Sequence, residues 1–237
     1  MLGLEDKVIL VSGGNRGIGA ATVGLLEELG ARVAYTYRSS PGPHGTLAIQ
    51  GDVTDKAGMA QVIARVEAEL GPIYGAVANA AIHTDNLFHN LEESQWRDVF
   101  ETNVFGAVNV MAPVTGLLAE RREGAMVFIG SVVADRGNFG QSNYSATKGA
   151  IHAMAKSMAR ELARKGVRVN VVAPGFIDTD MVKGLPDPIR DKLTKEIPMR
   201  RFGQPQDIAW AVAYLLSPIA SAYVTGEVLK VNGALIT

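Results

Sequence analysis

The sequence predicts an α/β protein, with a parallel sheet that carries helices on both faces, and three observations support this. Short apolar runs rich in β-branched residues alternate with segments of helical periodicity. The runs are apolar at nearly every position, which is typical of parallel strands covered on both faces by crossover helices. No repeat, linker or low-complexity segment interrupts the alternation. We therefore expect a single domain over all 237 residues, enough chain for one sizeable core.

The elements follow in order from the N-terminus. A strand is expected at 7–12 ("KVILVS"), a helix at 19–30 ("GAATVGLLEELG") and a second strand at 31–37 ("ARVAYTY"). A helix would normally follow the second strand, but the Pro- and Gly-rich patch at 39–45 ("SSPGPHG") predicts that this crossover keeps at most a short stub. Further strands are expected at "YGAVAN" (74–79), "AMVFIGS" (125–131) and "VRVNVVAP" (167–174).

The stretch "QSNYSATKGAIHAMAKSMARELARKG" at 141–166 has the periodicity of one amphipathic helix. Its opening face carries Tyr144 and Lys148 one turn apart. From 178 to 205 the periodicity weakens, because four prolines punctuate charged residues. We interpret this segment as a mobile cover over a site.

Charge and composition give no reason to expect a nucleic-acid or membrane partner, since 23 basic residues balance 24 acidic ones. The start of the chain, "MLGLEDKVILVSGG", lacks the basic flank and long apolar core of a signal peptide, so we expect a cytoplasmic protein. The chain has no cysteine, and its four histidines have no ligand spacing. We therefore expect neither disulfides nor a bound metal.

A glycine-rich turn follows the first strand, with Gly13, Gly17 and Gly19 in a G-x-x-x-G-x-G arrangement. Glycines let the backbone approach a pyrophosphate, and the helix that follows offers unpaired N–H groups and a positive dipole end. The turn predicts a dinucleotide site. The spacing differs from G-x-G-x-x-G, and a βα turn without a ligand would look the same, so the motif alone leaves both interpretations open.

The end of the second strand indicates which dinucleotide is bound. NAD enzymes place an acidic residue there to bind the ribose 2′-OH, whereas this strand ends with Tyr37 and Arg38. Arg38, together with Arg16 in the glycine turn, can pair with a 2′-phosphate. The sequence therefore favours NADP(H), the alternative being that both arginines are solvated surface charges.

These features resemble the short-chain dehydrogenase/reductase family over residues 6–233. The matching stretches are "SGGNRGIG" (12–19), with serine for the usual threonine, "GDV" (51–53), "ANAAI" (78–82), with Ala78 and Ala81 for the Asn and Gly of N-N-A-G, and "VVAPGFIDTDM" (171–181). The resemblance implies a single-domain Rossmann-like fold, a doubly wound parallel sheet with helices on both faces. Its cofactor half would cover about 1–110 and its catalytic half about 111–237. The implied cofactor contacts are Gly13, Asn15, Arg16, Gly17, Ile18, Gly19, Arg38, Asp52, Val53, Asn79, Ala80, Tyr144, Lys148, Pro174, Gly175, Ile177 and Thr179.

The resemblance also implies a catalytic set of Asn103, Ser131, Tyr144 and Lys148. Reducing a ketone requires a proton donor at its oxygen, and Tyr144 is the candidate. The ammonium of Lys148 should lower the pKa of this phenol from about 10 towards neutrality, and should bind the nicotinamide ribose. Ser131 would donate to the substrate oxygen, and Asn103 would hold a water. Each residue alone also has an ordinary structural interpretation, and the combination favours catalysis.

Within the family the sequence is most similar to 3-oxoacyl-(acyl-carrier-protein) reductases of the actinobacterial, mycolate type. This likeness implies NADPH-dependent reduction of 3-oxoacyl-(acyl-carrier-protein) to the (3R)-3-hydroxyacyl product in fatty-acid biosynthesis. It also implies that Arg122 and Lys165 lie beside the active-site mouth and dock the acidic carrier, although both could be ordinary surface charges.

Two alternatives remain for the activity. One is a reductase of free ketones, acetoacetyl-CoA or polyketide intermediates. The other is a catalytically silent NADP-binding scaffold, suggested by Ala81 and by the ending "VNGALIT" where the family commonly has D-G-G. The resemblance further implies a homotetramer, with interfaces at the Tyr144 helix and at the C-terminal segment 221–237.

Overall fold

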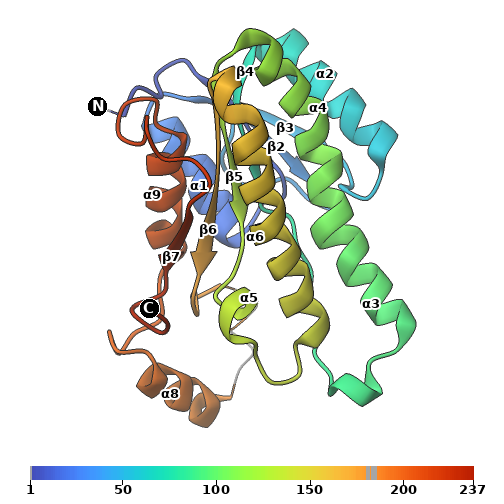
Figure 1. The fold of residues 1–237 in the computed structure, drawn as a ribbon, viewed down its shortest axis with the longest axis vertical. Coiled ribbons are helices and arrows are strands. Elements are labelled where there is room, and N and C mark those ends of the chain that lie inside the picture. The colour runs from blue at the N-terminus through green and yellow to red at the C-terminus, as the bar shows by residue number, and fades with distance from the viewer. Residues whose placement is uncertain (1, 180–181, 183–185) are drawn as a thin grey trace.

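The chain folds around one seven-stranded sheet, shown in Figure 1 for a computed structural model that describes residues 2–179, 182 and 186–237. The strand order is β3-β2-β1-β4-β5-β6-β7, and every neighbouring pair is parallel. This arrangement confirms the predicted Rossmann-like α/β class. The strands are β1 (Val8–Val11), β2 (Arg32–Tyr37), β3 (Leu47–Gln50), β4 (Ile73–Ala78), β5 (Gly124–Ile129), β6 (Val167–Pro174) and β7 (Val228–Val231).

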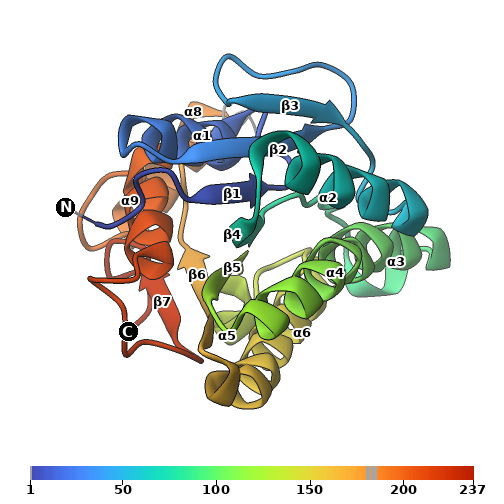
Figure 2. The same ribbon diagram turned by 90° about the horizontal axis from the view of Figure 1, so that it is seen from above.

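Helices cover both faces of the sheet (Figure 2). One face packs against α2 (Lys56–Leu70), α4 (Gly106–Arg121) and α6 (Ser142–Leu162), and the other against α1 (Gly17–Glu28) and α9 (Pro205–Leu216). Among the described residues, the remaining helical segments are α3 (Glu93–Phe100), α5 (Val133–Arg136), α8 (Asp187–Glu196), the 3₁₀ turns η1 (Phe88–Asn90) and η3 (Ala163–Lys165), and the π-helical turn η2 (Glu101–Phe105).

Side chains that alternate in direction along each strand form the hydrophobic cores on the two faces of the sheet. In β1, Val8 and Leu10 face α2, α4 and α6, whereas Ile9 and Val11 face α1 and α9. All four side chains are at most 4% exposed. Successive residues of a strand point to opposite faces, so a strand covered on both sides must be apolar throughout, as the sequence predicted.

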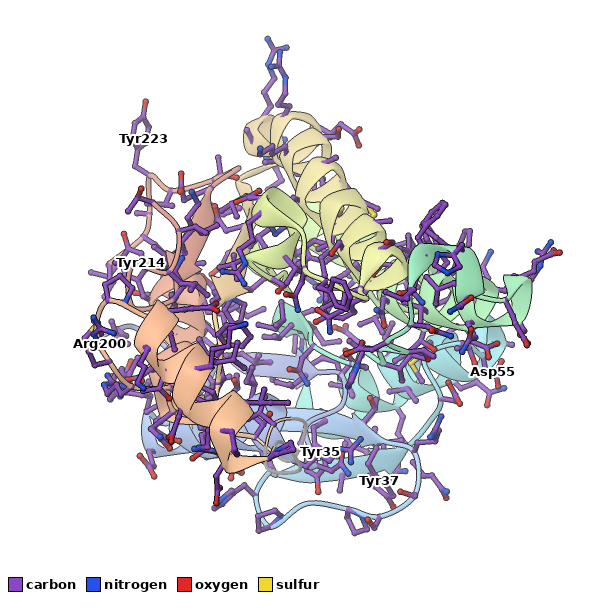
Figure 3. The ribbon with its side chains drawn as sticks, turned by 90° about the horizontal axis from the view of Figure 1, so that it is seen from below. Tyr35, Tyr37, Asp55, Arg200, Tyr214 and Tyr223 are labelled. Atoms are coloured by element: carbon purple, nitrogen blue, oxygen red, sulfur yellow. The ribbon has the colours of Figure 1, made fainter. Side chains whose placement is uncertain are left out.

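The crossover from β2 to β3 has no helix, as the Pro- and Gly-rich patch predicted. Residues 38–46 form an irregular loop that Tyr35 fastens to β2. The Tyr35 hydroxyl accepts a hydrogen bond from the Gly42 N–H at 2.8 Å and lies 3.2 Å from the Gly42 carbonyl oxygen. Figure 3, which looks at the sheet from below, labels Tyr35 and Tyr37 on this strand.

The predicted long helix is present as α6, which η3 extends to Lys165. Gly166 then adopts φ 69°, the left-handed conformation that commonly ends a helix. The helical stretch Glu93–Arg121 is long and apolar enough to cross a membrane by those measures alone. Within it Val110, Val114 and Leu118 belong to the core and are at most 1% exposed, as is usual for a helix of a globular domain.

The predicted cover segment is described only in part, because 180–181 and 183–185 lie outside the described residues. Its described remainder contains the helix α8, although the prolines weaken the helical periodicity of the sequence there. Pro186 is the N-cap residue of α8, and Pro188 lies in its first turn. Proline suits the start of a helix, where an N–H group has no helical acceptor.

Candidate active site

The predicted catalytic and cofactor residues gather near the carboxyl ends of the strands. The glycine turn follows β1, Asn79 follows β4, Ser131 follows β5, and Gly175 follows β6. Because all these strands are parallel and adjacent, their carboxyl ends meet at one edge of the sheet. In open α/β sheets this edge is where ligands bind.

The glycine turn is built for close backbone approach. Gly13 and Gly17 have φ angles of 65° and 54°, values that residues with a Cβ atom rarely adopt. A Cβ on Gly19 would lie 2.1 Å from the Gly13 carbonyl oxygen. The N-terminus of α1, which starts at Gly17, therefore lies against the turn, and the turn fits a pyrophosphate.

Asn79 holds the glycine turn against the end of β4. Its side-chain amide donates to the carbonyl oxygens of Ser12 at 3.0 Å and Gly13 at 2.9 Å. The Ser12 hydroxyl accepts from the N–H groups of Asn79 at 3.0 Å and Ala80 at 3.2 Å. Serine at position 12 thus makes the bonds that join the two loops, and Asn79 has a structural role besides any contact with a cofactor.

The other predicted cofactor residues lie around this turn. Arg16 is the N-cap residue of α1 and Arg38 directly follows β2, and both are exposed. Thr179 comes close to the turn, since a Cβ on Gly17 would be 3.5 Å from its Cγ2 atom. The Asp52 carboxylate accepts from the N–H and the hydroxyl of Thr54 at 3.0 and 2.9 Å. Of the remaining predicted contacts, Val53 and Ile177 are buried, and Asn15 donates to the Ser40 carbonyl oxygen at 3.1 Å.

Asn103 lies in the π-helical turn η2 and is 2% exposed. Its side chain bonds both backbone groups of Ile82, accepting from the N–H at 2.8 Å and donating to the carbonyl oxygen at 2.9 Å. It also donates to the Thr147 hydroxyl at 3.1 Å. The hydrogen bonds of Asn103 therefore reach distant segments of the chain and do not stay within its own helix. Single π turns inside helices frequently mark functional sites.

Tyr144 and Lys148 share one face of α6, as their spacing predicted. The Lys148 ammonium is 5.5 Å from the centre of the Tyr144 ring and donates to the Ile129 carbonyl oxygen at 2.8 Å. Ser131 follows Ile129 by two residues and is 9% exposed, and its hydroxyl accepts from the Val133 N–H at 3.3 Å. Lys148 thus fastens α6 to the end of β5, next to Ser131.

The expected lowering of the Tyr144 pKa is wrong for the protein by itself. Burial and the carboxylate of Asp85 raise the pKa of the phenol to about 12. Burial lowers the pKa of Lys148 to about 8, because a desolvated ammonium is unstable. The sequence spacing correctly predicted that the two groups lie close together, but it does not show how strongly burial removes water from around them.

A second polar cluster, which no sequence motif predicts, lies beside Tyr144. His83 Nδ1 lies 2.9 Å from Asp85 Oδ1, and the rings of His83 and Tyr144 meet edge to face with their centres 6.3 Å apart. "HTD" is an unremarkable loop tripeptide. Only the fold, which lays this loop across the start of α6, reveals the contact.

Arg122 and Lys165 do not lie beside the active-site mouth of their own chain, which corrects the expectation for carrier docking. Arg122 precedes β5 and Lys165 precedes β6, so both lie at the amino ends of the strands. They are brought together there, with Arg122 donating to the Arg164 carbonyl oxygen at 2.9 Å. Tyr144 lies in the first turn of α6, whose 21 residues span about 30 Å, and Arg122 and Lys165 lie beyond its other end.

Known proteins with similar sequences identify the class of this site. A family model described as enoyl-(acyl carrier protein) reductase matches residues 13–235. The chain therefore belongs to the short-chain dehydrogenase/reductase family. The acetoacetyl-CoA reductases and 3-oxoacyl-(acyl-carrier-protein) reductases of this family are oxidoreductases that act on a CH–OH group with a nicotinamide cofactor.

Individual relatives place the chain more narrowly. An acetoacetyl-CoA reductase of Synechocystis sp. is 54% identical over 234 residues, which cover 98% of each chain. The 3-oxoacyl-(acyl-carrier-protein) reductases of Vibrio cholerae and Escherichia coli are 42% and 40% identical over 242 residues, or 99% of each chain. The chain thus lies close to the 3-oxoacyl-(acyl-carrier-protein) reductases, as its sequence motifs predicted.

Proposed function

We propose that the protein is an NADPH-dependent reductase that converts 3-oxoacyl thioesters to (3R)-3-hydroxyacyl thioesters. One observation carries the proposal. Tyr144 and Lys148 on α6 adjoin the end of β5 that bears Ser131, in a chain 54% identical to an acetoacetyl-CoA reductase. The division into a cofactor half up to about residue 110 and a catalytic half beyond it is part of this proposal.

A nicotinamide cofactor, when bound, supplies the hydride that adds to the carbonyl carbon of the substrate. Tyr144 donates a proton to the carbonyl oxygen as negative charge develops there. The Ser131 hydroxyl donates a hydrogen bond to the same oxygen and stabilises that charge. Both groups stand on ordered elements, Tyr144 in the first turn of α6 and Ser131 at the end of β5.

Lys148 is suited to return a proton to Tyr144. Its pKa of about 8 lets it exchange a proton near neutral pH, and its ammonium is 5.5 Å from the tyrosine ring centre. Asn103 supports this pair through Thr147, whose hydroxyl donates to the Tyr144 carbonyl oxygen at 2.7 Å. Asn103 would also hold the water through which protons reach Lys148.

The choice of NADPH over NADH rests on Arg16 and Arg38. These exposed cations flank the glycine turn and the end of β2, where the ribose of a bound dinucleotide would lie. A guanidinium can pair with a 2′-phosphate in bidentate fashion. Replacing Arg38 by alanine should raise the KM for NADPH and leave the KM for NADH nearly unchanged.

Acetoacetyl-CoA is the first candidate substrate, because the acetoacetyl-CoA reductase relative is the more similar of those named. A 3-oxoacyl chain on acyl-carrier protein is the second candidate, which the relatives from Vibrio cholerae and Escherichia coli favour. Fatty-acid biosynthesis is the process that the second candidate would serve.

A substrate panel tests the proposal. We expect NADPH oxidation with a higher kcat/KM for acetoacetyl-CoA and for carrier-bound 3-oxoacyl chains than for simple cyclic ketones. A higher kcat/KM for the free ketones would refute thioester reduction.

We also propose a cytoplasmic homotetramer. What supports the assembly is the exposure of large apolar side chains near both expected interfaces. Phe105, just before α4, is 53% exposed, and Tyr223, in the C-terminal segment, is fully exposed and points away from the body of the molecule in Figure 3. Sedimentation of the purified protein would show a single species of four chains.

A further inference from the structure

The loop that carries His83 and Asp85 is fastened to the start of α6 at several points. The Gln141 side-chain amide donates to both carboxylate oxygens of Asp85, at 3.0 and 3.1 Å. The Asn143 amide donates to the Thr84 carbonyl oxygen at 3.2 Å, and Asn143 is fully buried. These bonds hold the Asp85 carboxylate beside the start of α6. Tyr144 lies in the first turn of that helix, so the charge of Asp85 has a fixed position relative to the phenol.

His83 contacts both this carboxylate and Tyr144. Its Nδ1 atom is 2.9 Å from Asp85 Oδ1, and its ring meets the Tyr144 ring edge to face at an interplanar angle of 72°. The side chains of His83 and Asp85 are 32% and 50% exposed, so solvent screens the pair only in part. Among the residues that the structure describes, Asp85 and Tyr144 are the titratable groups in contact with His83, and Lys148 lies 5.5 Å from the centre of the Tyr144 ring.

We propose that His83 and Asp85 act as an electrostatic control on Tyr144, in which protonated His83 neutralises the Asp85 carboxylate beside the phenol. The two are positioning residues, because they act through Tyr144. The inference deepens the function proposed above and rests on it for the role of Tyr144.

The charges predict the direction of the effect. The hydrogen bond to Asp85 raises the pKa of His83 above its ordinary value. Burial would raise the pKa of Asp85, but hydrogen bonds from His83 and Gln141 lower it. Below its raised pKa His83 is therefore an imidazolium and cancels the carboxylate charge. Above that pKa the carboxylate is uncompensated, the phenol holds its proton more tightly, and Tyr144 becomes a weaker acid.

The pH dependence of kcat/KM for reduction of acetoacetyl-CoA tests this control. We expect the wild type to show a partial decrease as His83 loses its proton, of about two- to fivefold, the size of an exposed charge pair's interaction. His83→Gln should abolish the decrease, and Asp85→Asn should move it to lower pH. His89→Gln is the matched control, since His89 is exposed on η1, and should behave as the wild type.

Persistence of the same decrease in His83→Gln, or an unchanged position in Asp85→Asn, would overturn the inference. A second readout does not depend on activity. NMR titration of ¹³C-labelled tyrosine, with the Tyr144 signal assigned by Tyr144→Phe, should show a lower Tyr144 pKa in Asp85→Asn than in the wild type. An equal pKa would overturn the inference whatever the enzyme reduces, whereas inactivity of the wild type towards all thioesters would refute the proposed function alone.

Discussion

Lys148→Met removes a charged side chain that is only 3% exposed. Burial lowers the pKa of Lys148 from its ordinary 10.5 to about 8. Between these two values the unfolded chain keeps a proton that the native protein has lost. The free energy of unfolding of the wild type must therefore rise with pH across this window, and Lys148→Met must lack that rise.

The size of the effect follows from the shift. One pKa unit corresponds to about 1.4 kcal/mol, so the wild type should gain about 2 kcal/mol relative to Lys148→Met between pH values of about 7 and 9.5. Changes that do not depend on pH, such as the lost bond to Ile129, cancel when only this difference between the two pH values is compared.

Urea unfolding at several pH values and one protein concentration measures the difference. Lys156→Met is the matched control, because Lys156 is exposed on the same helix, and it should follow the pH dependence of the wild type. If Lys148→Met and the wild type gave parallel curves, the ammonium would not be desolvated, and Lys148 could not exchange protons near neutral pH as we propose.

Three further substitutions test separate parts of the site. Tyr144→Phe should lower kcat by about 10²- to 10⁴-fold through loss of the proton donor while NADPH still binds, and kcat within fivefold of the wild type would refute the role of Tyr144. Asn103→Ala breaks both bonds to Ile82 and leaves half-buried backbone groups unpaired, so the free energy of unfolding should fall by about 2 kcal/mol, and an unchanged melting temperature would contradict this. Gly19→Ala places a Cβ 2.1 Å from the Gly13 carbonyl oxygen and should weaken NADPH binding at least about tenfold by displacing the turn, whereas unchanged affinity in a fluorescence titration would argue against a pyrophosphate site there.

The fold was largely predictable, because its information is local. The apolar strands, the glycine turn and the helix with Tyr144 are each specified by a few adjacent residues, and parallel pairing then brings their ends to one edge. The missing crossover helix was also visible, since the proline-rich patch around Gly42 interrupts helical periodicity.

The electrostatics of the site were not predictable, because they depend on contacts between distant segments. The direction of the Tyr144 pKa reflects burial and a carboxylate at position 85, and neither follows from the spacing on α6. The bonds of Asn103 to Ile82 span 21 residues. Arg122 and Lys165 were assigned by resemblance alone, and the strand direction places them at the opposite end of the sheet from Tyr144.

The central claim is that Tyr144, Ser131 and Lys148 reduce a 3-oxoacyl thioester with NADPH. The most direct measurement is the rate of NADPH oxidation by the purified wild-type protein with acetoacetyl-CoA, beside the same assay with NADH. We predict turnover with (3R)-3-hydroxybutyryl-CoA as product and a higher kcat/KM with NADPH. No turnover with either cofactor, or a clear preference for NADH, would contradict the account.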